Sequence, residues 1–557
     1  MPIDMKNLES LCRRRGFIFG SSEIYGGING FWDYGPMGVE LKKNVKDAWW
    51  HDMVRNPPPG PDGQEIAMVG VDCAIIMNPK VWEASGHAAG FADPMRKCAK
   101  CGHFVRADQL WDVLTTSTWV DSFLQQFTPI TGQYDTGKFL HWARGKGKKV
   151  APNLALVRNP EVTLAWLATR INGQPDAPPD MKELLRYIAT EQLEQTGLQE
   201  PCPQCGGELG APSPFKLMFE TWAGLVQDDD HRVFLRPETA QGIFANFKNV
   251  CDSTRVRLPF GIAQIGKAFR NEVTPRNYTF RSREFEQMEI EFFCRPEESM
   301  KWYEYWRDVR KNWYTRLGIK SDNLRPREQG KDELAHYSIG TTDIEYLFPF
   351  SNEPQELEGV AHRGEFDLKA HMTASGKDLS YFDEQLWQTA DKSAYGGDKK
   401  KETEAKQNPP YRFVPHVIEP SAGADRFTLA VLCEAYTEDK LPDEKGQMQE
   451  RLVMKFHPRL APVKAAILPL VNKDNMPEIA EKLYRELKDD WNVQYDDGGA
   501  IGRRYRRQDE IGTPFCVTID GETLQNQSVT IRDRDSAQQR RVPIGDVAGE
   551  IRKAMKN

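Results

Sequence analysis

Two neighbouring segments, residues 263–272 and 280–292, constrain this chain more than any other part of its sequence. The first ends in Phe-Arg-Asn-Glu, and the second reads Phe-Arg-Ser-Arg-Glu-Phe-Glu-Gln-Met-Glu-Ile-Glu-Phe. Side chains alternate between the faces of a strand, so Arg270 and Glu272 should lie opposite Ile265 and Phe269. On the second strand the apolar face is Met288, Ile290 and Phe292, and the other face is Arg281, Arg283, Phe285, Gln287 and Glu289. We therefore expect a strand pair with one buried face and one chemical face.

The chemical face suits a nucleotide and an amine-bearing substrate. Arginine forks grip phosphate oxygens, a phenyl ring stacks on a purine, and carboxylates accept hydrogen bonds from amines. ATP together with an amino compound would fit such a face. The alternative is a half-buried strand pair with ordinary surface ion pairs, which are common and contribute little stability.

Three stretches resemble the signature motifs of class II aminoacyl-tRNA synthetases, in the family's order. Gly35-Pro36-Met37-Gly38, leading into an expected helix at 39–50, resembles the first motif, and the strand pair resembles the second. Residues 419–426, with an expected helix at 427–432, resemble the third. Within this class, residues 236–242 and 356–361 resemble the single-polypeptide, homodimeric glycyl-tRNA synthetases. The similarity extends from Gly16 to the C-terminus.

The resemblance implies an α+β fold of three parts. A catalytic domain at 1–457 is built on an antiparallel sheet flanked by helices, and a cysteine-flanked insertion interrupts it at 96–212. An α/β anticodon-binding domain follows at 458–557. The pattern there favours strands at 463–470, 492–496 and 515–519 and a helix at 476–489. Within the other parts, 181–193 has helical spacing, and the polar stretch 398–410 is expected to be a mobile surface loop.

The activity implied by the resemblance is attachment of glycine to tRNA(Gly) through a glycyl-adenylate. Arg270 and Arg426 are the catalytic candidates, on the α- and γ-phosphates, while Glu272 holds the adenine edge and Phe285 its face. The implied ATP-binding residues are Arg270, Asn271, Glu272, Phe280, Arg281, Ser282, Arg283, Glu284, Phe285, Glu356, Leu357, Gly423, Ala424, Asp425 and Arg426. Magnesium is expected with ATP, with Glu356 and Glu419 as candidate ligands.

The amino-acid pocket carries over from the family onto a second set of residues. It is Arg106, Glu238, Phe285, Glu286, Gln287, Met288, Glu289, Glu419, Pro420, Ser421, Ala422 and Gly423. Glycine has no side chain to grip, so selectivity should come from excluding any Cβ. One departure from the family stands before Glu356, where Glu353-Pro354-Gln355 replaces the usual Gly-Trp-Gly.

Four of the ten cysteines form two Cys-x-x-Cys pairs, each followed by glycine. In a reducing compartment such pairs more often bind zinc than form disulfides, because four thiolates complete a tetrahedral site. Cys98, Cys101, Cys202 and Cys205 are therefore candidate ligands of a structural zinc. The gap of roughly a hundred residues exceeds the usual spacing, so the fold would have to join the pairs. Four ordinary reduced cysteines are the alternative.

In the C-terminal part, arginines interleaved with an aromatic residue suit single-stranded RNA, whose bases stack on aromatic and guanidinium planes. The expected tRNA contacts are Arg503, Arg504, Tyr505, Arg532 and Arg534. The alternative is a solvated, charged helix face.

Composition agrees with this interpretation. The chain has 557 residues, 39% of them hydrophobic, which is enough for two or three domains. The net charge of −7 argues against general nucleic-acid binding, so cations that contact tRNA should be clustered. No apolar run is long enough for a membrane span, and residues 1–15 are too charged for a signal peptide, so we expect a soluble, cytoplasmic protein.

Two other functional classes remain open. One is a catalytically inactive relative that keeps the fold and a nucleic-acid surface, although Arg270, Glu272, Phe285 and Arg426 are all present. The other is a synthetase for threonine, proline or histidine with the same C-terminal domain. Pyrophosphate exchange measured across amino acids distinguishes all three.

Overall fold

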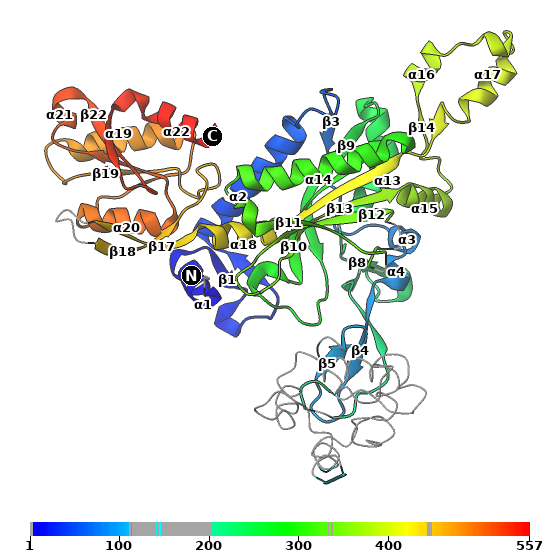
Figure 1. The fold of residues 1–557 in the computed structure, drawn as a ribbon, viewed down its shortest axis with the longest axis horizontal. Helices are drawn as coiled ribbons and strands as arrows, with labels where there is room; N and C mark the ends of the chain where they lie inside the picture. The colour runs from blue at the N-terminus through cyan, green and yellow to red at the C-terminus, as the bar shows by residue number, and fades with distance from the viewer. Residues whose placement is uncertain are drawn as a thin grey trace, which may run out of the picture. The chain divides into compact units, whose positions relative to one another are not determined.

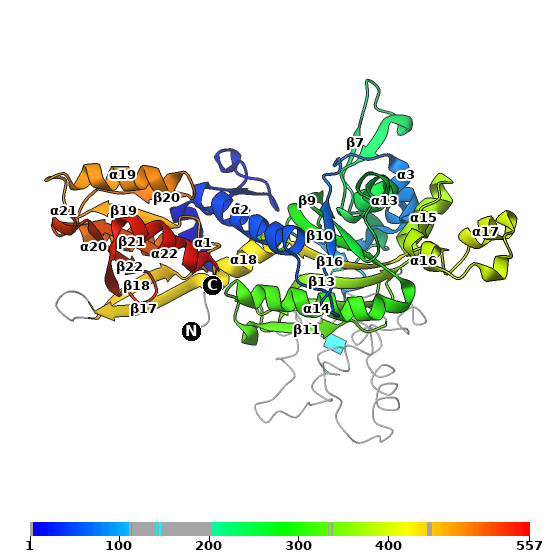
Figure 2. The ribbon, with the colours of Figure 1, turned by 90° about the horizontal axis from the view of Figure 1, so that it is seen from above.

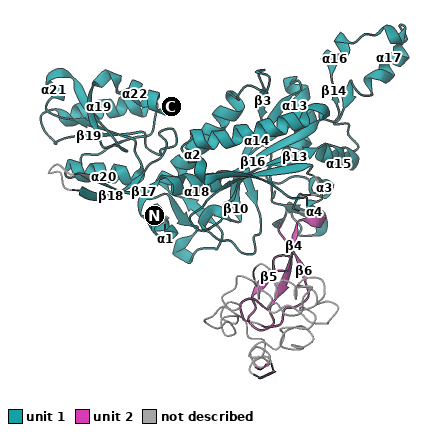
Figure 3. Cartoon of the chain, viewed as in Figure 1, with its two compact units in different colours: residues 1–88, 218–557 teal, residues 89–217 magenta. Residues whose placement is uncertain are grey.

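The computed structural model describes residues 4–110, 202–205, 207–331, 333–335, 338–442 and 448–556, with residues 113, 141, 144 and 145. The expected helix at 181–193 lies outside the described residues. The chain divides into two compact units, residues 1–88 with 218–557, and residues 89–217 (Figure 3). The second unit contains the whole of the expected insertion. Among the described residues, no helix is long and apolar enough to cross a membrane.

The first unit is built on a seven-stranded sheet (Figure 1). Its strands, in spatial order, are β11 (Leu324–Glu328), β12 (Gly340–Tyr346), β13 (Gln355–Gly364), β16 (His416–Gly423), β10 (Glu284–Cys294), β9 (Phe260–Phe269) and β3 (Ala67–Gly70). All neighbours are antiparallel except β3 and β9, which run parallel. The expected antiparallel sheet is confirmed.

Strands β9 and β10, the pair expected from the sequence, are shorter than predicted at the ends where the chain connects them. β9 ends at Phe269 and β10 begins at Glu284, although Arg270 N still donates to Arg283 O at 2.9 Å. Between them the chain makes a 3-10 turn at Tyr278–Phe280, entered through Asn277 with φ of +59°. Because this turn takes the backbone out of the ladder, residues 271–283 connect the two strands instead of extending them.

One face of the sheet packs against the main hydrophobic core. Helix α14 (Ser299–Arg316) contributes Trp302, Trp306 and Trp313, and α2 (Pro36–Trp50) and α18 (Ala424–Ala435) add further buried side chains. Met288, Ile290 and Phe292 of β10 are fully buried in this core. The predicted alternation along this strand is thus confirmed.

The opposite face is covered only in part. Helices α13 (Ala240–Thr254) and α15 (Phe366–Ser375) form a second core there, in which Phe244 and Phe247 pack against Phe260 and Phe293. Figure 2 shows α13 and α14 on opposite sides of strands β13 and β16. The remaining part of this face carries the polar side chains of β10, β13 and β16 and lines a cavity.

The C-terminal part has the expected α/β arrangement. Its mixed sheet has the order β20 (Val493–Tyr495), β19 (Ala465–Pro469), β21 (Phe515–Ile519), β22 (Ser528–Asp533) and β23 (Gln539–Pro543). β19 is parallel to β20 and β21, and the other pairs are antiparallel. Helices α19 (Met476–Lys488), α20 (Ile501–Ile511), α21 (Thr523–Asn526) and α22 (Val547–Lys556) complete it.

The prediction of a loop at 398–410 is wrong over most of this stretch, because residues 399–406 form helix α17 (Lys399–Lys406). Asp398 caps it by accepting hydrogen bonds from the backbone N–H groups of Lys400 and Lys401. Lysine, glutamate and alanine are good helix formers, and an aspartate cap stabilises the first turn, which explains the helix. It lies with α16 (Glu384–Thr389) beyond the strand pair β14 (Tyr381–Phe382) and β15 (Arg412–Phe413) (Figure 1).

The other elements are short. The first unit also has α1 (Met5–Arg15), β1 (Ile18–Gly20), β2 (Trp32–Tyr34), α3 (Pro79–Ala84), β7 (Glu220–Trp222), β8 (Arg232–Phe234), β17 (Tyr436–Pro442) and β18 (Met448–Met454). Helix α4 (His87–Gly90) runs into the second unit, whose described sheet has the order β5 (Phe104–Arg106), β4 (Ala92–Lys97) and β6 (Ser213–Lys216).

Candidate active site

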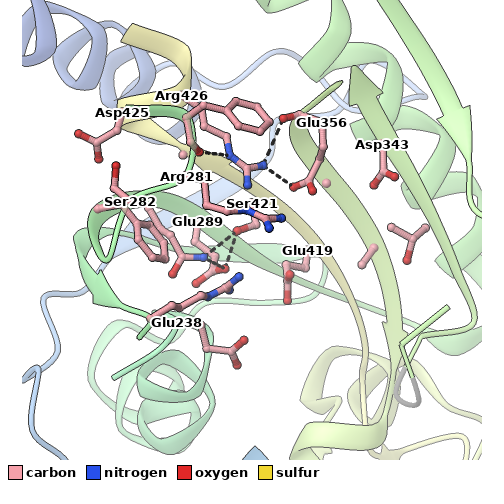
Figure 4. A pocket seen from close by; sticks show the side chains of 18 of the residues that line it. Glu238, Arg281, Ser282, Glu289, Asp343, Glu356, Glu419, Ser421, Asp425 and Arg426 are labelled. Carbon is pink, nitrogen blue, oxygen red and sulfur yellow. Dashed lines mark hydrogen bonds and ion pairs between the residues drawn. The ribbon is translucent and has the colours of Figure 1, made fainter. Parts of the chain in front are cut away.

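A cavity of about 370 Å³ lies on the polar face of β10, β13 and β16 (Figure 4). It brings together side chains from the second and third motifs and from the segments 236–242 and 356–361. The expected residues that line it are Glu238, Arg270, Glu272, Phe280, Arg281, Ser282, Phe285, Gln287, Glu289, Glu356, Glu419, Ser421, Gly423, Asp425 and Arg426. The polar face predicted from the strand period therefore forms a single site.

One end of the cavity is held by Arg426, in the first turn of α18. Its Nη1 lies 3.0 Å from Glu356 Oε1, its Nε donates to Phe280 O at 3.2 Å, and the guanidinium lies 4.7 Å from the Phe280 ring centroid. The backbone carbonyl and the ring fix the guanidinium plane. Figure 4 shows Arg426 and Glu356 facing each other in the cavity.

Arg270 is the second cavity arginine. Its Nε donates to Pro237 O at 3.1 Å, and the guanidinium lies 5.4 Å from the centroid of the Phe285 ring. Glu272 lies beside Arg281, with 4.0 Å between Arg281 Nε and Glu272 Oε2. An aromatic ring, two arginines and a carboxylate thus converge at this part of the cavity.

The other end is rich in carboxylates. Glu289 is 1% exposed and accepts hydrogen bonds from Ser421 Oγ at 2.7 Å, from Gln287 Nε2 at 3.3 Å and from the Thr239 hydroxyl. Burial, together with the nearby charge of Glu238, raises the pKa of Glu289 above its usual value, although the two hydroxyls oppose this.

Glu419 and Glu238 have pKa values shifted in opposite directions. Burial raises the pKa of Glu419 to about 8, although Arg363, which also binds Asp367 through two 2.8 Å hydrogen bonds, forms an ion pair with it. Burial acts on Glu238 too, but His87 and Arg363 hold its pKa well below the usual range. At neutral pH the pocket therefore keeps an ionised Glu238 without ionising every carboxylate.

A further glutamate lies behind this end. Glu291 is fully buried, and neither of its carboxylate oxygens has a hydrogen-bond partner among the described residues. Its oxygens and those of Glu289 and Glu419 approach within 4.8 Å of one another. Burial and the neighbouring carboxylates raise the pKa of Glu291 well above its usual value, which favours the neutral acid.

Several expected ligands do not line the cavity. Met288, Leu357, Ala422 and Ala424 are at most 1% exposed and pack into the main core on the opposite face. They belong to the motifs because the motifs are continuous stretches of strand and helix, whose side chains point to both faces. Pro420 is likewise buried within β16.

Other expected ligands have partners outside the cavity. Glu284 pairs with Lys267, and Glu286 pairs with Lys42 at 2.7 Å and Lys46 at 3.0 Å. Arg283 donates to Glu272 O and Asn29 O, both at 3.0 Å. Asn271, in the connection after β9, does not line the cavity either. These side chains support the walls of the site.

The sequence motifs did not include all of the residues that line the cavity. Thr279, Gln329, Glu333, Ala335, Thr341, Asp343, Gly359 and Ala361 also line the cavity. Asp343 is held by Arg327 Nη2 at 2.9 Å and Gln329 Nε2 at 3.0 Å. The alternation Thr341, Asp343, Glu345 against Thr342, Ile344, Tyr346 on β12 was the available signal for a strand with a polar face.

The four expected zinc ligands come together in the unit 89–217. The sulfurs of Cys98, Cys101, Cys202 and Cys205 all lie within 4.8 Å of one another, with 3.6 Å from Cys98 to Cys205 and 3.8 Å from Cys101 to Cys202. A Cβ at Gly207 would lie 3.1 and 3.2 Å from two of these sulfurs, so glycine lets the chain close around them. Arg106, in the same unit, pairs with Asp93 at 3.0 Å and with Asp108 at 2.6 Å.

Three of the five expected tRNA contacts are buried, which is a correction. Arg504 and Arg534 are each 2% exposed and donate to backbone carbonyls, Arg504 to Pro469 O at 2.6 Å and Arg534 to Phe456 O at 2.7 Å. Arg532 is 7% exposed and binds Asp509 at 2.8 and 3.1 Å. Tyr505 lies against the Arg532 guanidinium at 4.9 Å, and Arg503 is exposed. The buried arginines hold the domain together rather than presenting charge to RNA.

Comparison with known proteins agrees with this fold. Residues 218–435 match the class II tRNA synthetase core domain (G, H, P, S and T), and residues 464–554 match an anticodon-binding domain. The structure resembles a prolyl-tRNA synthetase of Cryptosporidium parvum, with a TM-score of 0.53 and 12% identity over 99% of this chain and 76% of that one. The core fold and its cavity define a class II aminoacyl-tRNA synthetase.

Relatives along the whole length are more specific. The glycine–tRNA ligase of Rhodopirellula baltica is 50% identical over 99% of both chains. That of Thermobifida fusca is 45% identical over 98% of this chain and 96% of its own. The chain belongs to the glycine–tRNA ligase family.

Proposed function

We propose that this chain attaches glycine to tRNA(Gly), using ATP and passing through a glycyl-adenylate. The observation that carries the proposal is one cavity with arginines and an aromatic ring at one end and carboxylates at the other. The first end suits a nucleoside triphosphate, and the second suits the ammonium group of an amino acid.

In the first step, a carboxylate oxygen of glycine attacks the α-phosphorus of ATP. A phosphorus–oxygen bond forms, the bond to the β-phosphate breaks, and pyrophosphate leaves. Arg270 supports the α-phosphate and Arg426 the γ-phosphate, while Phe285 stacks on adenine and Glu272 accepts from its amino group. The chain supplies alignment and charge stabilisation rather than covalent chemistry.

Magnesium would enter with ATP. The Glu356 carboxylate, half exposed beside Arg426, is an oxygen ligand of the type that magnesium prefers. Glu419 is bound by Arg363 at the carboxylate end, so we assign it to the amino-acid pocket and not to magnesium. Bound magnesium neutralises part of the phosphate charge.

Glycine is held by its ammonium group, through Glu238, Glu289 and Ser421. Because Glu238 and Glu289 are buried, the protein has a steric means of excluding an amino acid that carries a Cβ. Arg106 is proposed from the family resemblance alone.

In the second step, a terminal ribose hydroxyl of the tRNA attacks the activated carbonyl and AMP leaves. The domain at 464–554 would read the anticodon, with the exposed Arg503 among the groups available to phosphates. We also propose a homodimer built through the first motif and helix α2, by resemblance to the family. Because tRNA and ATP meet in the cytoplasm, we expect the chain to work there.

We further propose that the four cysteines hold a structural zinc. The sulfur separations of 3.6 and 3.8 Å agree with the edge of a tetrahedron of thiolates at zinc, about 3.8 Å. Such an ion would tie the two ends of the insertion together, with every coordination position filled. Elemental analysis of protein purified without chelator should find about one zinc per chain; finding no metal would exclude this site.

The test of the main proposal is amino-acid-dependent exchange of pyrophosphate into ATP. Glycine should drive exchange, whereas alanine, serine, threonine, proline and histidine should not. Exchange driven by another amino acid, with glycine inert, would assign the chain a different substrate. No exchange with any amino acid would indicate a catalytically inactive relative.

A further inference from the structure

The two outer carboxylates of the amino-acid pocket are oriented by different partners. Glu419 is bound by the Arg363 guanidinium, which is 1% exposed and is shared with Asp367. Glu238 instead has Gln241 Nε2 at 3.0 Å from its Oε1 and His87 Nε2 at 3.4 Å from its Oε2. The charge on Glu238 is therefore opposed directly by one imidazole and not by an arginine fork.

His87 is itself held in a defined position. Its ring meets the ring of buried Trp82 edge-on, with centroids 5.6 Å apart, and its Nδ1 lies 2.8 Å from Ser85 Oγ. The Ser85 hydroxyl donates to Trp82 O at 3.4 Å. These contacts, which follow helix α3 directly, fix the ring plane and aim Nε2 at Glu238.

The hydrogen-bond pattern assigns one hydrogen on the ring. An ionised carboxylate can only accept, so the nitrogen that faces Glu238 must be Nε2–H. The other ring nitrogen, Nδ1, meets the Ser85 hydroxyl at 2.8 Å. His87 thus presents an N–H donor to Glu238 while Ser85 holds the opposite side of the ring.

We propose that His87 is a positioning residue for glycine recognition, which turns the Glu238 carboxylate toward the ammonium group of the substrate. This inference rests on the proposed function of the cavity. A single N–H at 3.4 Å uses one lone pair of the carboxylate and leaves others for the substrate, whereas a bidentate arginine would occupy both oxygens. The lowered pKa of Glu238, which burial alone would raise, agrees with a hydrogen-bond donor at this place.

This positioning role predicts that replacing His87 changes the dependence of exchange on glycine and not its dependence on ATP. Without the imidazole, Gln241 would hold only one oxygen of Glu238, and the carboxylate could turn away from the pocket. ATP binds at the arginine end, through groups that His87 does not touch, so its binding should not change. A merely structural role for His87 would impair both substrates together.

The experiment measures pyrophosphate exchange with the full chain, varying glycine and ATP separately. His87→Leu should raise the glycine concentration for half-maximal exchange by about 10- to 100-fold, because it removes a hydrogen bond to a charged group. The ATP dependence should stay within about threefold of wild type. His87→Gln, which places an amide N–H near the position of Nε2, should recover most of the glycine dependence.

Two further variants complete the test. His231→Leu removes an exposed histidine–carboxylate pair, with 2.6 Å between His231 Nδ1 and Asp228 Oδ1, outside the cavity lining, and should change neither dependence. His87→Asn has an amide too short to reach Glu238, and replaces His87→Leu if that variant does not fold. An unchanged glycine dependence, an equal loss for ATP, or a glutamine variant no better than the short variant would overturn the inference. Wild-type protein without glycine exchange would instead overturn the proposed function.

Discussion

Four arginines show how the surroundings of a guanidinium decide its role. Arg270 and Arg426 line the cavity, where an aromatic ring and a backbone carbonyl orient each guanidinium. Arg504 and Arg534 are buried and donate to the carbonyls of neighbouring strands and turns. Of these four, only Arg270 and Arg426 can meet a substrate in the cavity, so exposure to the cavity rather than residue type decides the role.

Arg270→Ala and Arg426→Ala should each lower adenylate formation by on the order of 100-fold or more, since each removes a charge-assisted contact to a phosphate. The fold should survive, because both side chains lie at the cavity wall. The measurement is the rate of glycine-dependent exchange, with circular dichroism to check folding. Arg485→Ala, which breaks an exposed helix pair with Glu481, is the control and should leave the rate unchanged. Activity within about threefold of wild type would remove the residue from the site.

Glu291→Gln should stabilise the protein increasingly as pH rises. The folded state raises the pKa of Glu291 through burial, then through Glu419, so between the unfolded and folded pKa values the unfolded chain is ionised while the folded chain is not. Wild-type stability therefore falls with pH in this window, by up to about 1.4 kcal/mol per pH unit from this group. Glutamine cannot ionise and avoids this loss.

The measurement for Glu291→Gln is the difference in apparent Tm from wild type at several pH values. The difference should be near zero below the unfolded pKa and should grow toward neutral pH. Glu304→Gln, at an exposed position of α14, is the matched control and should show no such trend. A difference independent of pH would show that Glu291 is ionised in the folded protein.

At the scale of single residues, the sequence predicted the polar face of β10 but not which arginines are buried. The period of two is a local property of the strand, so it could be counted in advance. The burial of Arg504 depends on which face of α20 meets the sheet. That face is Arg504, Gln508 and Ile511, at helical spacing, and all three are buried. A charged residue at a core position is rare without partners, and its carbonyl partners come from distant strands.

At the scale of helices and strands, the close packing at the start of helix α2 explains why glycine is required there. Its first turn docks against the backbone at 16–17, where Gly35 N donates to Phe17 O at 2.9 Å and Met37 N donates to Gly16 O at 2.9 Å. A Cβ at Gly38 would lie 1.8 Å from Phe17 O, which is backbone and cannot turn aside. The first motif is thus a close contact between a helix and a neighbouring chain segment.

Gly38→Ala should destabilise the protein by about 3 kcal/mol or more, because the added methyl group forces α2 away from this backbone. The apparent Tm should fall, and glycine-dependent exchange should fall with it. Gly502→Ala is the matched control, since a Cβ there meets nothing within 4 Å in helix α20. An unchanged Tm for Gly38→Ala would mean that the docking of α2 adjusts without cost.

Element boundaries were predicted less well than element types. The C-terminal strand at 515–519 was predicted in full, and the helix at 476–489 to within one residue. The strands around the second motif ended earlier than expected, because the turn at Tyr278–Phe280 has no sequence signal as clear as strand alternation. Helix α17 was missed because a lysine-rich, solvated segment was interpreted by charge rather than by helix propensity and its aspartate cap.

At the scale of the whole molecule, the catalytic and C-terminal parts of the first unit are joined by side-chain contacts as well as by the polypeptide. Asn44 of α2 donates to Leu460 O at 3.2 Å and Ala461 O at 2.9 Å, which holds the segment just before the anticodon-binding domain against the main core. Arg451 of β18 donates to Arg534 O at 2.6 Å and lies 3.3 Å from Asp509. The sequence predicted the order of the domains, but these contacts could not be predicted, since they join residues far apart in the chain.

The last prediction concerns the separation of the two activities. All residues that line the cavity lie at or before Arg426, whereas the anticodon-binding domain begins at 464. A chain ending at residue 463 keeps Leu460 and Ala461 and should fold, because Arg451 retains Asp439 through two 2.8 Å hydrogen bonds. It should keep glycine-dependent exchange within about tenfold of the full chain. Charging of tRNA(Gly) should fall by at least about 100-fold, because the anticodon contacts are lost.

The tRNA affinities of the shortened chain and the full-length chain are compared at several salt concentrations. The affinity of the full-length chain should fall steeply with salt, as expected when arginines displace counterions from phosphates, and the shortened chain should show a smaller slope. Circular dichroism and light scattering check that the shortened chain is folded and show whether it forms the proposed dimer. A folded short chain that charged tRNA(Gly) at the full rate would show that residues 464–554 do not read the anticodon. A folded short chain without glycine exchange would show that the cavity depends on the contacts of Arg451 with Asp509 and Arg534.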